Sequence, residues 1–326
     1  METILIILGG LGLFLFAISH ISEVLKDLLG EKAKNLLARF TRNTLTGILT
    51  GIAITVILDS SSAVIIMAIV LVKAKALTFR QAIGIVLGAN IGTTFSSQII
   101  AMNVGKFSPI PIFLGLVLVF FSKSDRLSRV GRVFIYFGIM FFGLYTMERA
   151  VEPLRDHPRF MSWMSKMEGP FIGAGTGALV TLLIQSSSAT VGMAITLAKK
   201  GLLSLAAGVA VMLGAELGTC ADTLLATVKG SRQALKTGLF HLLFNLITII
   251  IGLLFFPWLI QLIIFISGGA SLEQQVANGH MLFNSIGVLL FLPFIGVTEK
   301  LLNRLLPDKI PEKTSSVPEI ALSGNS

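Results

Sequence analysis

Five long stretches of this chain carry no charged residue, and they constrain its fold more than any other feature. A helix needs about 20 consecutive apolar residues to cross a hydrocarbon core about 30 Å thick. Charged residues make up only 13% of the chain, about half the share typical of a soluble domain. The charge-free stretches are residues 3–22, 81–105, 169–198, 237–272 and 274–298. The sequence therefore predicts an all-α polytopic membrane protein.

The positive charge of the chain lies mainly in short segments between apolar stretches. The formal net charge is +9, and residues 123–132 alone contain four basic side chains. Basic loops are typical of the cytoplasmic side of a membrane, so we expect no nucleic-acid partner.

The first apolar stretch follows Met1 without a basic segment or a cleavage site, which favours a membrane helix over a removable signal peptide. Cys220 is the only cysteine, so no disulfide can form within the chain.

The chain contains an internal duplication with a constant offset of 126 residues. Segment 46–63 recurs as 172–189 with a Ser-Ser-Ser triplet in each copy, and segment 88–93 recurs as 214–219 with a Gly-Thr pair. General similarity between apolar helices does not produce matched polar landmarks, so the chain consists of two related halves. We predict a first repeat over 1–126, a second repeat over 127–252, closing membrane helices over 253–306 and a disordered tail over 307–326.

A shorter repetition occurs towards the C-terminus, where the His-x-x-Phe-Asn pattern of His241–Asn245 returns as His280–Asn284. We expect two paired helices whose histidines bond helix to helix rather than bind a metal. Duplicated halves in a membrane protein are typical of secondary transporters, often with inverted topology. The basic loop of the first half has an uncharged counterpart at 249–258, as inversion predicts.

Each half also contains two apolar segments that are too short to cross a membrane. Residues 43–58 and 60–72 flank the polar turn Asp59–Ser62, and the second half repeats this break at Gln185–Ser188. We predict two re-entrant hairpins with their tips at bilayer depth, where irregular backbone must be buried or line a wet cavity. Serines that cap the second arm leave backbone N–H groups free, which favours an anion site. The alternative is that these serines only pack helices closely or bond back to carbonyls.

The glycine-rich segments 88–94 and 214–219 predict a broken helix in each half. Carbonyl groups opened at such a break offer oxygen ligands to a hard cation. The side chains that could join them are Asn90, Thr93, Glu216 and Thr219. The alternative is a flexible kink that serves packing only.

Three carboxylates lie in apolar segments that contain no Lys or Arg to pair with them. They are Asp59, Glu216 and Asp222. Ionisable groups inside a membrane are costly, which marks these acids as functional residues. We interpret them as ligands of Na⁺ or H⁺, against the alternative that they are simply protonated.

The doubled segments resemble those of the type II sodium–phosphate cotransporter family, including its bacterial members. The marks of that family are a doubled Gln-Ser-Ser-Ser, each followed by Gly-(Ala/Ser)-Asn-Ile-Gly-Thr. The corresponding segments are 59–62 with 88–93 and 185–188 with 214–219. Asp59 replaces the first glutamine and Glu216 replaces the second asparagine, so the ligands of the coupling ion differ in charge from those of relatives.

The resemblance implies inward transport of inorganic phosphate, driven by a Na⁺ gradient through alternating access, in the inner (plasma) membrane of a bacterium. Together, the residues and the resemblance predict two sets of contacts. The predicted substrate contacts are Ser60, Ser61, Ser62, Thr94, Ser186, Ser187 and Ser188. The predicted cation contacts are Asp59, Asn90, Thr93, Gln185, Glu216, Thr219 and Asp222. Na⁺ is the expected coupling ion, and no other cofactor is expected.

Other functions remain to be weighed against this one. A transporter of sulfate or arsenate, or one coupled to H⁺, would use the same residue types. An enzyme would need a base beside a tip serine, and the sequence places no His, Lys or Asp–His pair there, so we expect no enzyme. The expected partners are inorganic phosphate, Na⁺ and the lipid bilayer, and a homo-oligomer is compatible with the sequence.

Overall fold

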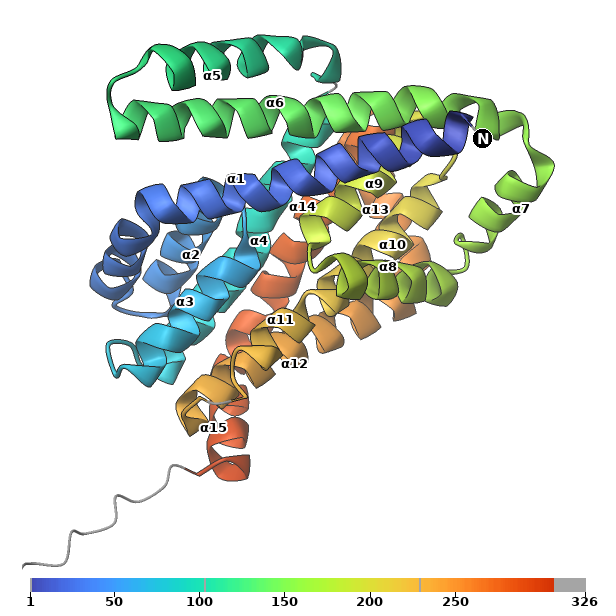
Figure 1. Ribbon diagram of the computed structural model, residues 1–326. Helices are drawn as coiled ribbons and strands as arrows, with labels where there is room; N and C mark the ends of the chain where they lie inside the picture. Colours follow the sequence, from blue (N-terminus) through green and yellow to red (C-terminus); the bar gives the residue numbers. More distant parts are fainter. Residues whose placement is uncertain (1, 103, 229, 308–326) are drawn as a thin grey trace, which may run out of the picture.

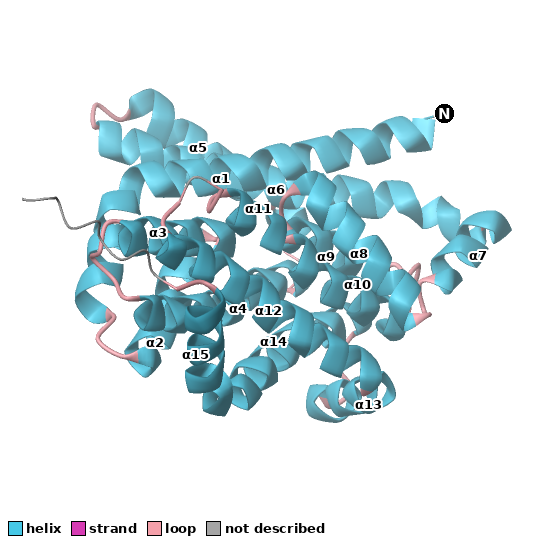
Figure 2. Ribbon diagram, turned by 90° about the horizontal axis from the view of Figure 1, so that it is seen from below, coloured by secondary structure: helices cyan, strands magenta, loops and turns pink. Residues whose placement is uncertain are grey.

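Helices form every regular element of the described structure, a computed structural model that covers residues 2–102, 104–228 and 230–307 (Figures 1 and 2). The predicted disordered tail lies outside the described residues, apart from Pro307. The α-helices are α1 (Glu2–Phe40), α2 (Thr44–Leu58), α3 (Ser61–Lys73), α4 (Phe79–Ala101), α5 (Pro109–Phe121), α6 (Asp125–Val151), α7 (Pro158–Lys166), α8 (Pro170–Ile184), α9 (Ser187–Lys199), α10 (Leu205–Gly218), α11 (Cys220–Leu225), α12 (Arg232–Leu254), α13 (Phe256–Ser267), α14 (Leu272–Phe291) and α15 (Ile295–Leu305). Three short 3-10 helices, η1 (Gly105–Phe107), η2 (Glu152–Asp156) and η3 (Leu292–Phe294), complete the described elements. The all-α prediction is confirmed.

Several of these helices are long and apolar enough to cross a membrane. Within the described ranges there are six such helices, and a seventh span if α7 and α8, which meet at 98°, are taken together. Large apolar side chains also face outwards: Phe121 and Phe265 are each 82% exposed. A surface of this kind suits hydrocarbon and not water. The chain is therefore a multi-pass membrane protein, as predicted.

Each half is built on the same close helix pair, α2 on α4 in the first half and α8 on α10 in the second. A Cβ atom added to Gly88 would lie 2.1 Å from the carbonyl oxygen of Ile48. A Cβ atom added to Gly214 would lie 1.8 Å from the carbonyl oxygen of Ala174. Both residues of the second contact follow those of the first by 126 positions. The duplication is therefore visible in backbone contacts that only glycine permits.

The course of α4 corrects the prediction of a broken helix in each half. α4 runs without interruption from Phe79 to Ala101, so the broken helix predicted at 88–94 is wrong in the first half. In the second half α10 ends at Gly218, but Thr219 keeps a helical conformation (φ −68°, ψ −16°) and joins α10 to α11 within one apolar span, Leu205–Leu225. The glycines of α4 serve close packing, because a missing side chain lets two helices touch while all intrahelical hydrogen bonds are kept.

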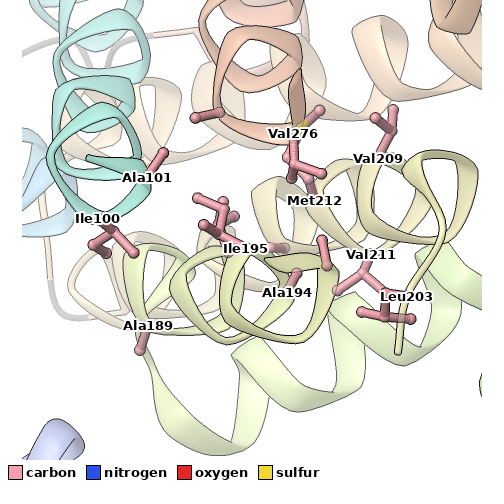
Figure 3. Close-up of a cluster of buried hydrophobic side chains, with 14 of the residues drawn as sticks. Ile100, Ala101, Ala189, Ala194, Ile195, Leu203, Val209, Val211, Met212 and Val276 are labelled. Carbon is pink, nitrogen blue, oxygen red and sulfur yellow. The ribbon is translucent and has the colours of Figure 1, made fainter. Parts of the chain in front are cut away.

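A shared core joins the two halves. Figure 3 shows side chains of α4, α9, α10 and α14 packed together, among them Ile100, Ala101, Ala189, Ala194, Ile195, Val209, Val211, Met212 and Val276. α1 lies along α6 and also contacts α3 and α9, one helix from each half (Figure 1). This placement brings the start of α3, the start of α9 and one face of α1 into one region.

Candidate substrate and cation site

The first predicted tip is a short break between α2 and α3. Asp59 ends α2 in the left-handed conformation (φ 51°, ψ 35°), and Ser60 follows in an extended conformation. The Ser60 hydroxyl accepts a hydrogen bond of 3.2 Å from the backbone N–H of Ala63 and so caps α3. Serine is a preferred residue at this position because its oxygen satisfies a free helix donor. The backbone N–H groups of Ser61 and Ser62 have no acceptor within the helix, as at any helix start.

The second tip has the same geometry. Gln185 ends α8 in the left-handed conformation (φ 59°, ψ 31°), and Ser186 caps α9 through a hydrogen bond of 3.2 Å from the N–H of Ala189. The hydroxyl groups of Thr181 and Thr190 lie 2.7 Å apart and join the two arms behind the tip. Two equivalent helix starts, each with three serines, therefore come from the two halves.

Both tips line one cavity of about 760 Å³. Ten of the predicted residues lie in its wall: Asp59, Ser60, Ser61, Ser62, Gln185, Ser186, Ser187, Ser188, Thr219 and Asp222. These residues are far apart in the sequence and come from both repeats. The arrangement offers hydroxyl and N–H donors beside carboxylate and amide oxygens, which suits an oxyanion and a hard cation together.

The two halves touch directly within this cavity. The Ser62 hydroxyl donates to Oδ2 of Asp222 at 3.2 Å and lies 3.2 Å from the hydroxyl oxygen of Thr219. The first tip is thus bonded to the short helix α11 of the second half.

Asp59 of the same tip is held by serines of two other helices. The Ser96 hydroxyl donates to the Asp59 carboxylate, and the Ser22 hydroxyl donates to the backbone carbonyl of Asp59 at 3.4 Å. Asp59 therefore connects the tip to α4 and to α1.

Four predicted residues lie elsewhere. Asn90, Thr93 and Thr94 are buried in α4 and donate to carbonyl groups of their own helix at 2.9, 3.1 and 2.8 Å. They are not among the residues that line the cavity. In the first half this segment is therefore neither a break nor a kink, and its polar side chains bond within the continuous helix α4.

Glu216, the fourth, is engaged with a histidine. Oε1 of Glu216 lies 2.7 Å from Nε2 of His280, and Nδ2 of Asn284 lies 3.4 Å from the same oxygen. Nδ1 of His280 lies 2.7 Å from the hydroxyl of Ser97 on α4. His280 thus bridges the two halves, as the prediction that these histidines bond helix to helix requires.

A matching network surrounds the other histidine. Nδ1 of His241 lies 2.9 Å from the hydroxyl of Thr223, and its Nε2 lies 3.1 Å from Nδ2 of Asn245. Ser97 and Thr223 are 126 positions apart, so equivalent hydroxyl groups of the two halves each meet one histidine. Two signals in the sequence could have predicted that each histidine meets a hydroxyl group: the repeated His-x-x-Phe-Asn pattern and this offset.

Within the described residues, no group of three or more His, Cys, Asp or Glu side chains forms a metal site.

Sequence reasoning missed one wall of the cavity. Ser19, Ser22, Glu23 and Lys26 of α1 line it, yet none of them was predicted. Their spacing could have predicted this wall, because positions i, i+3, i+4 and i+7 share one face of a helix that is otherwise mostly apolar there.

Comparison with known proteins gives relatives of similar length and relatives that are much longer. The chain is 28% identical over 318 residues to the uncharacterized protein YqeW of Bacillus subtilis (strain 168), covering 94% of this chain and all of YqeW. It is 25% identical over 312 residues to the "Putative inorganic phosphate export protein YjbB" of Escherichia coli (strain K12), covering 95% of this chain but only 57% of YjbB. No solved structure matches the chain.

A shorter match links the chain to an animal protein. The chain is 32% identical over 108 residues to the sodium-dependent phosphate transport protein 2B of Homo sapiens, covering 32% of this chain and 16% of that protein. The family model described as Na+/Pi-cotransporter matches residues 13–149 and 155–290, which together make up most of the chain. These matches confirm the resemblance noted in the doubled serine segments, and the chain belongs to the Na⁺/Pi-cotransporter family.

Proposed function

We propose that this chain carries inorganic phosphate across a membrane together with Na⁺, by alternating access at the cavity between the two serine tips. The single observation that carries the proposal is that two equivalent helix starts, one from each half, line one cavity with carboxylates beside them. The family and the names of its members support the choice of phosphate and Na⁺ as substrates.

The tips suit a small oxyanion. Each presents free backbone N–H groups at a helix start, where the helix dipole also favours negative charge. Ser61 and Ser187 are buried, and the neighbouring hydroxyls can rotate to donate to oxygen. In the proposed bound state, phosphate accepts hydrogen bonds from both tips.

The acids of the cavity explain why a cation must accompany the anion. Asp59 and Asp222 line the same wall as the serines. Two like unit charges about 4 Å apart repel by about 4 kcal/mol at an effective dielectric constant of about 20. Phosphate therefore binds only weakly until cations screen these carboxylates. We propose that Na⁺ ions bind at Asp59 and at Asp222 with Thr219 and Gln185, and so couple the two fluxes.

We propose inward transport, because an inward Na⁺ gradient drives a symporter of this kind inwards. The name of YjbB points to export by that protein. A carrier that works by alternating access is reversible, so the gradients imposed in an experiment decide the direction and reveal the coupling ion.

Uptake into liposomes tests the function. Purified protein is reconstituted, and uptake of labelled phosphate is measured with an inward Na⁺ gradient, with an inward H⁺ gradient and with neither. We expect accumulation only with the Na⁺ gradient. Accumulation driven by H⁺ alone would identify a proton-coupled carrier instead. Stronger inhibition by unlabelled sulfate or arsenate than by unlabelled phosphate would identify a different anion as the substrate.

A variant at the tips tests the site. The double substitution Ser61→Ala with Ser187→Ala should raise the KM for phosphate about a hundredfold or more, because each of the two lost hydrogen bonds to a charged ligand costs about 1.5–3 kcal/mol. The control is Ser165→Ala, a serine on the exposed side of α7. An unchanged KM in the double variant, with the protein still monodisperse in detergent, would remove the tips from the substrate site.

A further inference from the structure

A polar face on α1 forms a third wall of the cavity. Ser19, Ser22, Glu23 and Lys26 all line it, and their spacing places them on one side of the helix. α1 contacts both α3 and α9, the two helices that begin at the serine tips. This face therefore borders the region where an anion held by both tips would lie.

The position of Lys26 relative to the first tip follows from one hydrogen bond. Ser22 donates to the backbone carbonyl of Asp59 at 3.4 Å, which holds α1 beside the tip. Lys26 lies four residues further along α1, about 6 Å along the helix axis. Its side chain lines the cavity, it is exposed, and no hydrogen bond or ion pair engages it within the described ranges. A flexible lysine stem of four carbons can carry its ammonium group over that distance.

The charges of the lining give Lys26 a specific role. The described lining contains three carboxylates, on Glu23, Asp59 and Asp222, and one basic side chain, on Lys26. The carboxylates of this wall repel an anion, whereas the helix starts and the lysine attract it. A lysine ammonium also has three rotatable donors, which suits a ligand that moves during transport.

We propose that Lys26 binds the transported oxyanion from the α1 wall of the cavity, beside the two serine tips. This inference rests on the proposed function and adds a residue outside the doubled motifs. Lys26 thus determines anion affinity, while the acids of the cavity set the dependence on cations.

The first test separates affinity from turnover. In the liposome assay Lys26→Gln should raise the KM for phosphate about tenfold, the low end of the range for a lost charged hydrogen bond because this side chain is exposed. Turnover at saturating phosphate should change less than about twofold, and Lys26→Arg should retain most of the affinity because it keeps the charge. The matched control is Lys32→Gln, an exposed lysine of the same helix that does not line the cavity.

The second test restores the charge chemically. Lys26→Cys is treated with a cationic aminoethyl thiosulfonate or with a neutral methyl thiosulfonate. Lys26→Gln, which carries only the native Cys220, measures any effect of the reagents at that cysteine, and we expect little because Cys220 is buried. The cationic reagent should restore phosphate affinity, the neutral reagent should not, and phosphate should slow the labelling.

The outcomes of the two inferences are distinct. If wild-type protein moves no phosphate under any gradient, the proposed function is wrong. If wild-type protein transports phosphate and Lys26→Gln has the KM of Lys32→Gln, only the role of Lys26 is wrong. Equal rescue by both reagents would also contradict a role for the charge.

Discussion

At the scale of single residues, the backbone of both tips is strained at the residue that precedes the first serine. Asp59 and Gln185 have φ values of 51° and 59°, in the left-handed region where glycine is the residue without penalty. A non-glycine residue there costs about 1–2 kcal/mol. Both halves nevertheless keep a side chain with oxygen atoms at this position, and both of these side chains line the cavity. The strain is understandable if these oxygens bind a ligand.

The two acids of the second half are predicted to differ in role. Asp222 lines the cavity, whereas Glu216 is buried against His280 and Asn284. Asp222→Asn should raise the Na⁺ concentration for half-maximal uptake about tenfold, because a hard cation loses a charged ligand. Glu216→Gln should leave that concentration within about twofold of wild type and lower the free energy of unfolding by about 1–3 kcal/mol.

Uptake against Na⁺ concentration and thermal unfolding in detergent measure these two effects. Na⁺ curves that shift equally for Asp222→Asn and Glu216→Gln would return Glu216 to the cation site. A shift for neither variant would remove Asp222 from the cation site as well.

At the scale of helices, glycine decides how close the pairs approach. Gly177 of α8 faces α10, where an added Cβ would lie 1.9 Å from the carbonyl oxygen of Val211. Its counterpart Gly51, 126 residues earlier, meets Ile85 in the same way at 2.5 Å. Such contact distances leave no room for a methyl group, so each tip depends on a glycine-packed helix pair behind it.

Gly177→Ala should therefore destabilise the second hairpin. The alanine methyl group forces α8 away from α10, at a typical overpacking cost of about 1–3 kcal/mol. The control lies two residues away on the same helix: Gly175→Ala meets nothing within 4 Å and should be neutral or stabilising, since alanine favours a helix by up to about 1 kcal/mol. Thermal unfolding in detergent compares the two, and equal midpoints would contradict this account of the packing.

At the scale of the whole molecule, the duplication extends from the sequence to side-chain networks. The tips, the glycine contacts and the hydroxyl groups that meet the two histidines all recur at the offset of 126 residues. The symmetry fails at Glu216, whose counterpart Asn90 bonds to its own helix. Alternating access needs two related halves that move against each other, and His280 lies at their junction.

Inverted topology of the repeats remains a prediction, and labelling can test it. Lys75 and Gly201 are equivalent loop positions, both exposed and both with positive φ. Lys75→Cys and Gly201→Cys, introduced separately, should react with an impermeant thiol reagent from opposite sides of the membrane. The buried Cys220 provides a low background. Labelling of both positions from the same side would establish a parallel repeat.

The sequence by itself determined the features that depend on local pattern. Apolar stretches long enough to span a membrane, the constant offset and the polar breaks between short apolar arms predicted an all-α protein with two related halves and two serine tips. Serine caps and helix starts are local structures, formed between residues a few positions apart. For this reason the two tips, between α2 and α3 and between α8 and α9, could be located without coordinates.

Tertiary structure alone decided which of these residues line one cavity. The same Gly-rich pattern is read as a break or as a packing surface, and only the contact with Ile48 shows that Gly88 packs while α4 stays intact. Glu216 meets His280 across 64 positions, and Lys26 reaches the cavity through the docking of α1 on the first tip. Contacts between distant segments depend on how whole helices pack, and no local pattern encodes that packing.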